Sequence, residues 1–302
     1  MSRALSVVMV VLSCAPLAWS QVEIFADGFE SGDTSAWSAT FGNPGRLVVE
    51  LPGGVLLALK YMPSGTFWLG SPVDERGRLD REDLHQVTLT QGYYVGQTEV
   101  TQGQWEAVTG TPMLLDCGSY GVGADYPVYC VSWNDIAGAG GFVDQLNAYL
   151  LSTGQPTGLR LPTEAEWERA ARAETQTRFS HGDVLECDDY CGACTTHDQY
   201  MWWCGSQPYG ASQPVGSRLA NGYGLYDMHG NVYEWVQDWY TQYLGFDPVA
   251  DPSGPGTGSD RVFRGGYWAD GAQYGRSAGR DGSYGLDGRD YGIGFRLART
   301  AE

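Results

Sequence analysis

Glycine occurs 43 times among the 302 residues of this chain, and 14 prolines interrupt it further. Because glycine costs about 1 kcal/mol per residue inside a helix and proline costs more, long uninterrupted helices are excluded. The chain also holds 11 Trp, 19 Tyr and 9 Phe, enough aromatic side chain to build a large core. This combination predicts a folded domain with short elements and long loops, not a helical bundle or a disordered chain.

The charge balance excludes one broad class of partner. The chain carries 36 Asp and Glu against 18 Lys and Arg, for a formal net charge of -18, and Lys60 is its one lysine. Such a chain repels phosphate, so we expect no nucleic-acid partner. A strongly acidic composition rich in Trp and Gly is typical of loop-rich extracellular domains, often of domains that bind cations.

The first residues have the pattern of a secretory signal peptide. Arg3 precedes an apolar run, and Ala18-Trp19-Ser20 supplies a small-x-small cleavage site. An alternative is a lipoprotein acylated at Cys14, although Leu12 is bulky where such sites usually have a small residue. We expect residues 1-20 to be a signal peptide, 21-54 a polar tether or lead-in, and 55-302 one domain. The expected location is secreted, periplasmic or extracellular, with no transmembrane segment.

Six cysteines remain after Cys14, and an even number in an oxidising compartment predicts disulfides. Cys117 and Cys130 flank a glycine-rich loop and are expected to pair. The other four are Cys187, Cys191, Cys194 and Cys204. Two disulfides of open connectivity are favoured there over a zinc site, which remains the alternative.

Local patterns predict several elements. Capping boxes at Thr101, Ser132 and Thr163 predict helices that end near Gly110, Gly154 and Ala173. Strands are expected over 65-70, 261-265 and 293-297, and a hairpin over 86-99 with its turn at 91-92. The charged stretch 73-84 is expected to be a solvated loop.

Catalytic motifs are scarce. The G-x-S-x-G match at 275-279 has no histidine after it, because the last histidine is His229, so a hydrolase of that type is not expected.

A calcium site is better supported than a catalytic motif, since two carboxylates and two main-chain carbonyls occur within eight residues. The expected ligands are Asp227, Gly230, Val232 and Glu234, and the alternative is that the two carboxylates only hydrogen-bond the turn.

The segment 267-292 is the candidate ligand-binding surface. Tyrosine gives large contact area at low entropic cost, and small residues let loops adapt, as in antibody-like binding sites. The alternative is a glycine-rich loop that merely covers the core. The expected contact residues are Tyr267, Trp268, Asp270, Tyr274, Arg276, Arg280, Tyr284, Asp287 and Tyr291.

Several segments together resemble the formylglycine-generating enzyme (sulfatase-modifying factor) family. They are Met62 to Ser71, Gly92 to Thr101, Tyr126 to Trp133, Arg160 to Glu168, Gly224 to Trp235, Arg261 to Gly266 and Gly294 to Arg296. They occur in the family's order over about residues 55-299. The resemblance implies an α+β fold with a C-type-lectin-like core and little regular secondary structure.

Function does not follow from the family alone. The oxidising members bind copper through two cysteines after an R-G-G-S motif, and the matching positions here are Asp270 and Gly275. Because Cu(I) prefers thiolate ligands, copper and oxidase chemistry are not expected. The family's calcium ligands do match, at Asp227, Gly230, Val232 and Glu234. Variable proteins of diversity-generating retroelements are also similar, with variable residues between R-G-G-x-W and I-G-F-R, here 264-268 and 293-296.

The resulting expectation is a secreted, non-catalytic module that is stabilised by calcium and binds a protein or glycan ligand through 267-292. The Asp, Gly, Tyr, Ser and Ala of that window can all arise from an AAC codon by changes at adenine, as in a variable protein. One alternative is an oxidase of the formylglycine-generating type with a displaced centre near residues 187-204. Another is a structural envelope protein in which the domain only packs.

Overall fold

Three small sheets carry the fold in the computed structural model, which describes residues 45-113, 116-187, 189-206 and 210-302. The first has the order β1-β2-β5-β11, the second β10-β6-β8-β9 and the third β3-β4-β7. The strands are β1 (Arg46–Glu50), β2 (Leu56–Met62), β3 (Gly65–Leu69), β4 (His85–Leu89), β5 (Tyr93–Gly96), β6 (Tyr233–Trp239), β7 (Val249–Ala250), β8 (Arg261–Arg264), β9 (Arg280–Asp281), β10 (Ile293–Phe295) and β11 (Ala298–Thr300). The strands predicted near 65-70, 261-265 and 293-297 are confirmed.

The described chain begins and ends in one sheet. β1 pairs antiparallel with β2, and β11 pairs antiparallel with β5. Residues 46-54, which the sequence assigned to the lead-in, therefore form part of the domain, and Val49 and Leu51 are fully buried. The described residues all belong to one compact unit. The predicted signal peptide and most of the predicted tether lie outside the described residues.

The predicted hairpin at 86-99 is wrong in its pairing. β4 lies between β3 and β7, whereas β5 lies between β2 and β11. Val87 and Leu89 bury their side chains in the same core cluster as Met62 of β2 and Tyr93 and Val95 of β5, so β4 and β5 share a core without pairing. The alternation of apolar and polar residues identifies which side chains of a strand face inward, but it does not specify which strand lies next to it.

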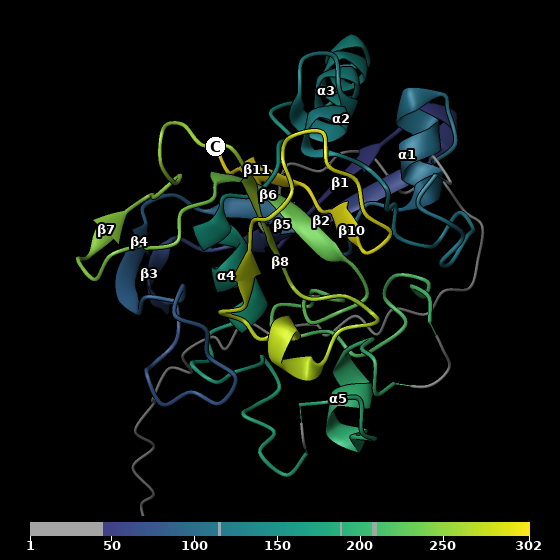
Figure 1. Cartoon of the computed structure of the whole chain (residues 1–302). Helices are drawn as coiled ribbons and strands as arrows, with labels where there is room; N and C mark the ends of the chain where they lie inside the picture. Colours follow the sequence, from purple (N-terminus) through teal and green to yellow (C-terminus); the bar gives the residue numbers. More distant parts are fainter. Residues whose placement is uncertain (1–44, 114–115, 188, 207–209) are drawn as a thin grey trace, which may run out of the picture. The chain divides into compact units, whose positions relative to one another are not determined.

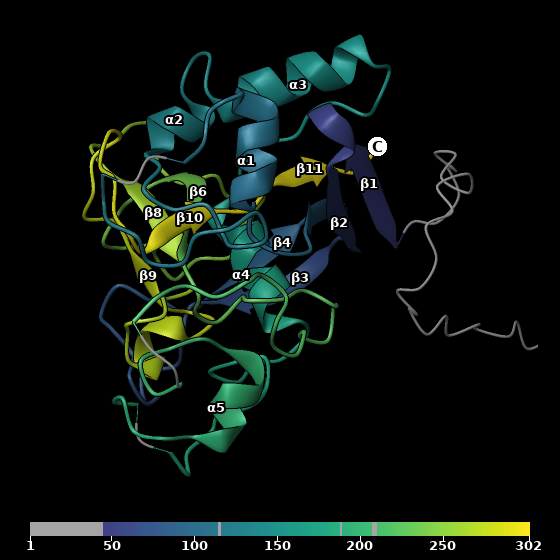
Figure 2. The ribbon, with the colours of Figure 1, turned by 90° about the vertical axis from the view of Figure 1, so that its right-hand side faces the viewer.

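All three capping boxes are confirmed at the N-termini of α1 (Gln102–Thr109), α2 (Trp133–Ala137) and α4 (Glu164–Arg172). The single long helix expected after Ser132 is wrong, because the chain leaves the helix at Gly138 and resumes it in α3 (Phe142–Ser152). A Cβ at Gly138 would lie 2.5 Å from the Asn134 carbonyl oxygen, so the extended conformation there suits glycine. Helices α1 to α3 lie at one end of the sheets and α5 (Thr195–Tyr200) at the other (Figures 1 and 2). No helix of the described ranges is long and apolar enough to cross a membrane.

The stretch 73-84, expected to be a solvated loop, is anchored in the interior. Glu82 is fully buried and accepts hydrogen bonds from Arg276 at 2.6 and 2.9 Å, and Glu75 pairs with the same guanidinium. The partners are about 200 residues apart in the sequence, so local charge density could not reveal the pairing. Buried arginines of this kind tie the loops to the sheets.

Candidate functional site

The candidate ligand-binding segment runs between β8 and β10. It leaves β8 through Gly265 and Gly266, whose φ angles are 99° and 73°. A Cβ on Gly266 would lie 2.9 Å from the backbone of Gly275, so glycine is required for the segment to fold back on itself. The segment then reaches the end that carries α5 and returns toward α2 (Figure 2).

Two residues expected on the binding surface lie in the interior instead. Arg276 is 0% exposed and pairs with Glu75 and Glu82, and the buried Arg280 donates to both oxygens of Glu164 at 2.6 and 2.8 Å. An arginine deprived of water needs a carboxylate partner, and all three carboxylates lie on distant parts of the chain. Arg276 and Arg280 therefore anchor the segment and do not lie on its outer surface.

Four aromatic rings of the site pack together, and we call Tyr120, Tyr267, Trp268 and Tyr291 the aromatic platform. The Tyr120 ring lies 5.5 Å from that of Trp268 and 4.8 Å from that of Tyr291. Tyr267 meets Trp268 and Tyr291 edge-on at 5.5 and 5.8 Å. All four are partly exposed. Three of them were predicted from the sequence as binding residues, and the structure brings those three together.

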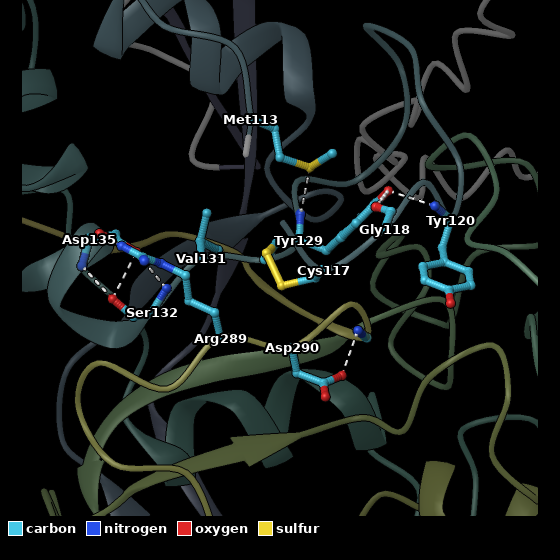
Figure 3. The surroundings of a disulfide bond; sticks show 12 residues. Met113, Cys117, Gly118, Tyr120, Tyr129, Val131, Ser132, Asp135, Arg289 and Asp290 are labelled. Atoms are coloured by element: carbon cyan, nitrogen blue, oxygen red, sulfur yellow. Dashed lines mark hydrogen bonds and ion pairs between the residues drawn. A yellow bond between two sulfur atoms is a disulfide. The ribbon is translucent and has the colours of Figure 1, made fainter. Parts of the chain in front are cut away.

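Tyr120 was missed by the sequence analysis, and a disulfide explains its position. The predicted Cys117–Cys130 bond is present, and it closes the loop that carries Tyr120. Within that loop the Tyr129 hydroxyl accepts from the Tyr120 N–H at 2.7 Å (Figure 3). The Cys130 N–H donates to the Asp290 carbonyl at 3.0 Å, so the closed loop is fastened to the candidate segment. Nothing in the local sequence of the loop indicates this contact.

Carboxylates border the platform. The Tyr233 hydroxyl, also missed by the sequence analysis, donates to Asp270. Burial, together with the nearby Asp281 and Asp290 carboxylates, raises the pKa of Asp270 to about 6, although the bond from Tyr233 opposes the rise. Tyr284 donates to Asp290 at 3.0 Å. Aromatic faces and acidic groups thus share one part of the surface.

Two further predicted contact residues lie at the edges of the segment. Tyr274 is 41% exposed on a short 3-10 turn, η3 (Ala272–Gly275). Asp287 is exposed and accepts from the Asn134 side chain of α2 at 2.8 Å. Both remain accessible, but neither makes a ring contact with the platform in the described part of the chain.

The residues predicted to bind calcium belong to a second, buried cluster. Glu234 accepts from Arg296 at 2.6 Å on each oxygen and from the Trp167 indole N–H at 2.6 Å. Asp227 accepts from the Gly216 N–H at 2.7 Å, while its other oxygen has no hydrogen-bond donor among the described residues. The same holds for one oxygen of Glu99, which the sequence analysis missed. Burial, and the charge of Asp227, raise the pKa of Glu99 well above its ordinary value.

All six cysteines of the described chain are in disulfides. Besides Cys117–Cys130, the bonds are Cys187–Cys194 and Cys191–Cys204. The two disulfides favoured over zinc are therefore confirmed, and their connectivity is now assigned. No group of three His, Cys, Asp or Glu side chains within the described ranges is arranged to hold a metal ion.

Short strands and helices around a loop-borne aromatic surface define an α+β protein of the C-type-lectin-like class. The family profile described as "Sulfatase-modifying factor enzyme 1-like domain" matches residues 58-301. The chain belongs to this family, as its motifs predicted. It is 35% identical over 193 residues to a formylglycine-generating enzyme of Streptomyces coelicolor, an alignment that covers 59% of this chain and 54% of the relative. The chain thus spans about half the length of that relative.

Two solved structures are similar over most of this chain. Treponema denticola variable protein 1 has a TM-score of 0.71 and 30% identity, and the match covers 86% of this chain and 100% of that one. PvdO from Pseudomonas aeruginosa has a TM-score of 0.67 and 28% identity, with coverage of 86% and 99%. These similarities confirm the predicted fold class.

Proposed function

We propose that this chain is a secreted, non-catalytic binding protein whose ligand contacts the aromatic platform and the adjoining Asp270. The observation that carries the proposal is that one segment holds both buried anchoring side chains and partly exposed aromatic side chains. Arg276 and Arg280 anchor it from inside, while Tyr267, Trp268 and Tyr291 remain partly exposed. Rigid aromatic side chains on an anchored loop supply contact area at low entropic cost.

Similarity to the Treponema denticola variable protein supports a variable surface of the same kind. The buried anchors would have to stay constant, whereas partly exposed positions such as Tyr267, Asp270 and Tyr274 tolerate change without loss of the fold. The predicted signal peptide and the three disulfides support secretion, because disulfides persist in oxidising compartments.

An oxidase of the formylglycine-generating type is the second candidate, favoured by the similarity to enzymes of that name. Its expected thiol positions are Asp270 and Gly275, and no cysteine follows Cys204 in the sequence. A displaced centre among residues 187-204 would need free thiols, yet those cysteines form disulfides. Ligand binding therefore accounts better for the residues that are present.

The binding proposal predicts that Trp268→Ala removes most binding. Phage displaying random peptides would be selected on the folded wild-type protein, and each selected clone would then be measured against variants. We expect Trp268→Ala to weaken the clones about 30-fold, as loss of a central interface aromatic does. Trp68→Ala is the matched control, because Trp68 is 43% exposed on β3, outside the segment. If every selected clone binds Trp268→Ala as well as wild type, the proposal is contradicted.

We also propose that calcium binds beside Asp227, with a ligand set that differs from the expected one. Glu234 does not fit as a ligand while Arg296 and Trp167 occupy both of its oxygens. Asp227 and Glu99 each keep a buried oxygen without a donor in the described chain, and hard carboxylate oxygens suit Ca²⁺. These two side chains, with main-chain carbonyls at Gly230 and Val232, would hold the ion and order the turn.

This calcium proposal predicts that CaCl₂ raises the melting temperature. At a free calcium concentration 100 times the dissociation constant, binding adds about 2.7 kcal/mol to the free energy of unfolding. Scanning calorimetry with CaCl₂, MgCl₂ or EDTA measures it, and Asp227→Asn should lose the calcium-dependent part. Asp251→Asn is a control, since Asp251 lies elsewhere and bonds Thr90. An unchanged melting temperature in millimolar calcium would contradict the calcium proposal.

A further inference from the structure

We infer that the ligand of the aromatic platform is a protein segment that presents lysine or arginine side chains. The inference rests on the proposed binding function and specifies its partner. It derives from the charges that remain unpaired around the platform once the ion pairs of the segment are assigned.

The arginines between residues 264 and 296 are all neutralised. Each pairs with a carboxylate from another part of the chain, so none is left to attract an anionic ligand. Arg289, the exposed member, donates to both oxygens of Asp135 at 2.7 Å (Figure 3). The pairs are Arg264 with Glu168, Arg276 with Glu82, Arg280 with Glu164, Arg289 with Asp135 and Arg296 with Glu234.

The aspartates of the same segment are mostly uncompensated. Asp281 pairs with Arg81 at 2.7 Å. Asp270, Asp287 and Asp290 form no ion pair within the described ranges; their bonds come from Tyr233, Asn134, Tyr284 and the Gly292 N–H. These donors orient the carboxylates without cancelling their charge. The segment therefore displays a net negative charge, in a chain whose formal charge is already -18.

Two of these carboxylates, Asp270 and Asp290, lie beside the aromatic rings. The Asp270 N–H donates to the Tyr267 carbonyl at 3.0 Å. Burial is the main cause of the raised pKa of the Tyr267 hydroxyl, and the charges of Asp270 and Asp290 add to it. An ammonium or guanidinium group can contact the face of a Tyr or Trp ring while a carboxylate beside it accepts its protons. The long-range negative field also speeds the approach of a basic partner.

A neutral glycan fits this arrangement less well. Sugar hydroxyls would leave the charge of Asp270, Asp287 and Asp290 uncompensated while covering part of it from water, which costs free energy. A basic protein segment removes that charge on binding. We therefore choose a cationic protein ligand over a glycan, and the latter becomes an outcome of the test.

The test uses the same phage selection on the intact mature protein, read by sequencing. Among clones that depend on Trp268, we expect lysine and arginine to be enriched over the unselected library. Asp270→Asn combined with Asp290→Asn should weaken those clones about tenfold, because a charge-assisted contact becomes a neutral one. Asparagine can still accept from Tyr233 and the Gly292 N–H. Asp80→Asn is the matched control, since Asp80 is fully exposed on the 73-84 loop. Raising the NaCl concentration should weaken the same clones.

The outcomes test the cationic ligand and the binding function separately. Clones that depend on Trp268 but are neutral or acidic would overturn the cationic inference and leave the binding function in place. Basic clones that ignore the double aspartate change would also overturn it, since their charge would then serve only non-specific attraction. If no clone depends on Trp268, the platform is not the binding surface, and both proposals fall. A glycan array that binds wild type but not Trp268→Ala would replace the protein ligand with a sugar.

Discussion

Replacing Arg296 with methionine is expected to lower the free energy of unfolding by about 3–5 kcal/mol, the usual cost of breaking a buried ion pair. Arg296 and Glu234 are both 0% exposed. The guanidinium also donates to the carbonyls of Gly96 and Tyr226, so it joins β5, β10 and the turn at 226. It is also the positive charge that opposes the raised pKa values of Glu99 and Asp227, whose main cause is burial. Without it, three buried carboxylates face one another.

Urea unfolding with the disulfides intact measures this loss. Arg289→Met is the matched control, because its side chain is 39% exposed and its partner Asp135 is partly exposed. A surface pair contributes at most about 1 kcal/mol, so this variant should unfold near the wild-type midpoint. Changing Glu234 to leucine together with Arg296→Met should be more stable than Arg296→Met alone, since the unpaired charge is then removed. Equal midpoints for the two single arginine variants would show that the buried pair contributes little.

Local chemistry made part of the fold predictable. The three capping boxes needed only side chains three residues apart, and each begins a helix in the structure. The Cys117–Cys130 bond was predictable because the two cysteines flank one loop and no other cysteine lies near them in the sequence. Strand pairing was not, because the turn at 91-92 connects two sheets and alternation carries no information about neighbours.

The candidate site was predictable in composition but not in arrangement. Tyr267, Trp268 and Tyr291 could be chosen because aromatic residues among glycines suit a binding loop. Arg276 and Arg280 were misplaced, since arginine is normally exposed and their partners lie 194 and 116 residues away in the sequence. Tyr120 joins the platform through a disulfide loop and a backbone bond to Asp290, a contact that no local pattern encodes.

The other large effect concerns His197, which should make the protein acid-sensitive. His197 is fully buried between Phe179 and Trp203, with ring centroids at 4.7 and 5.3 Å, and its Nδ1 lies 3.1 Å from the Nε2 of His181. Burial lowers its pKa from 6.5 to about 4 and outweighs the opposing charges of Asp189, Glu186 and Asp198, while Arg178 lowers it further.

The sign of the pH effect follows from that difference. Below pH 6.5 the unfolded chain takes up a proton at His197, whereas the folded protein does so only near pH 4. The contribution of neutral His197 to the free energy of unfolding is therefore complete above pH 6.5, and it is lost as the pH falls toward 4. A difference of about 2.5 pKa units corresponds to about 3 kcal/mol at 1.36 kcal/mol per unit. The pKa of His181, lowered mainly by burial to about 2, acts in the same direction.

Comparing His197→Phe with wild type isolates this contribution. Raised carboxyl pKa values, such as that of Asp238 at about 7, act in the opposite direction, but both proteins share them and they cancel. Phenylalanine keeps the ring contacts and cannot take up a proton. Urea unfolding between pH 7.5 and 4.5 should therefore show a smaller acid loss in the variant. Tyr200→Phe, which keeps the ring stacked on His181 and leaves the histidines in place, should follow wild type. Parallel profiles for wild type and His197→Phe would mean that His197 gains its proton equally easily in the folded and unfolded chains, and that His197 is no source of acid sensitivity.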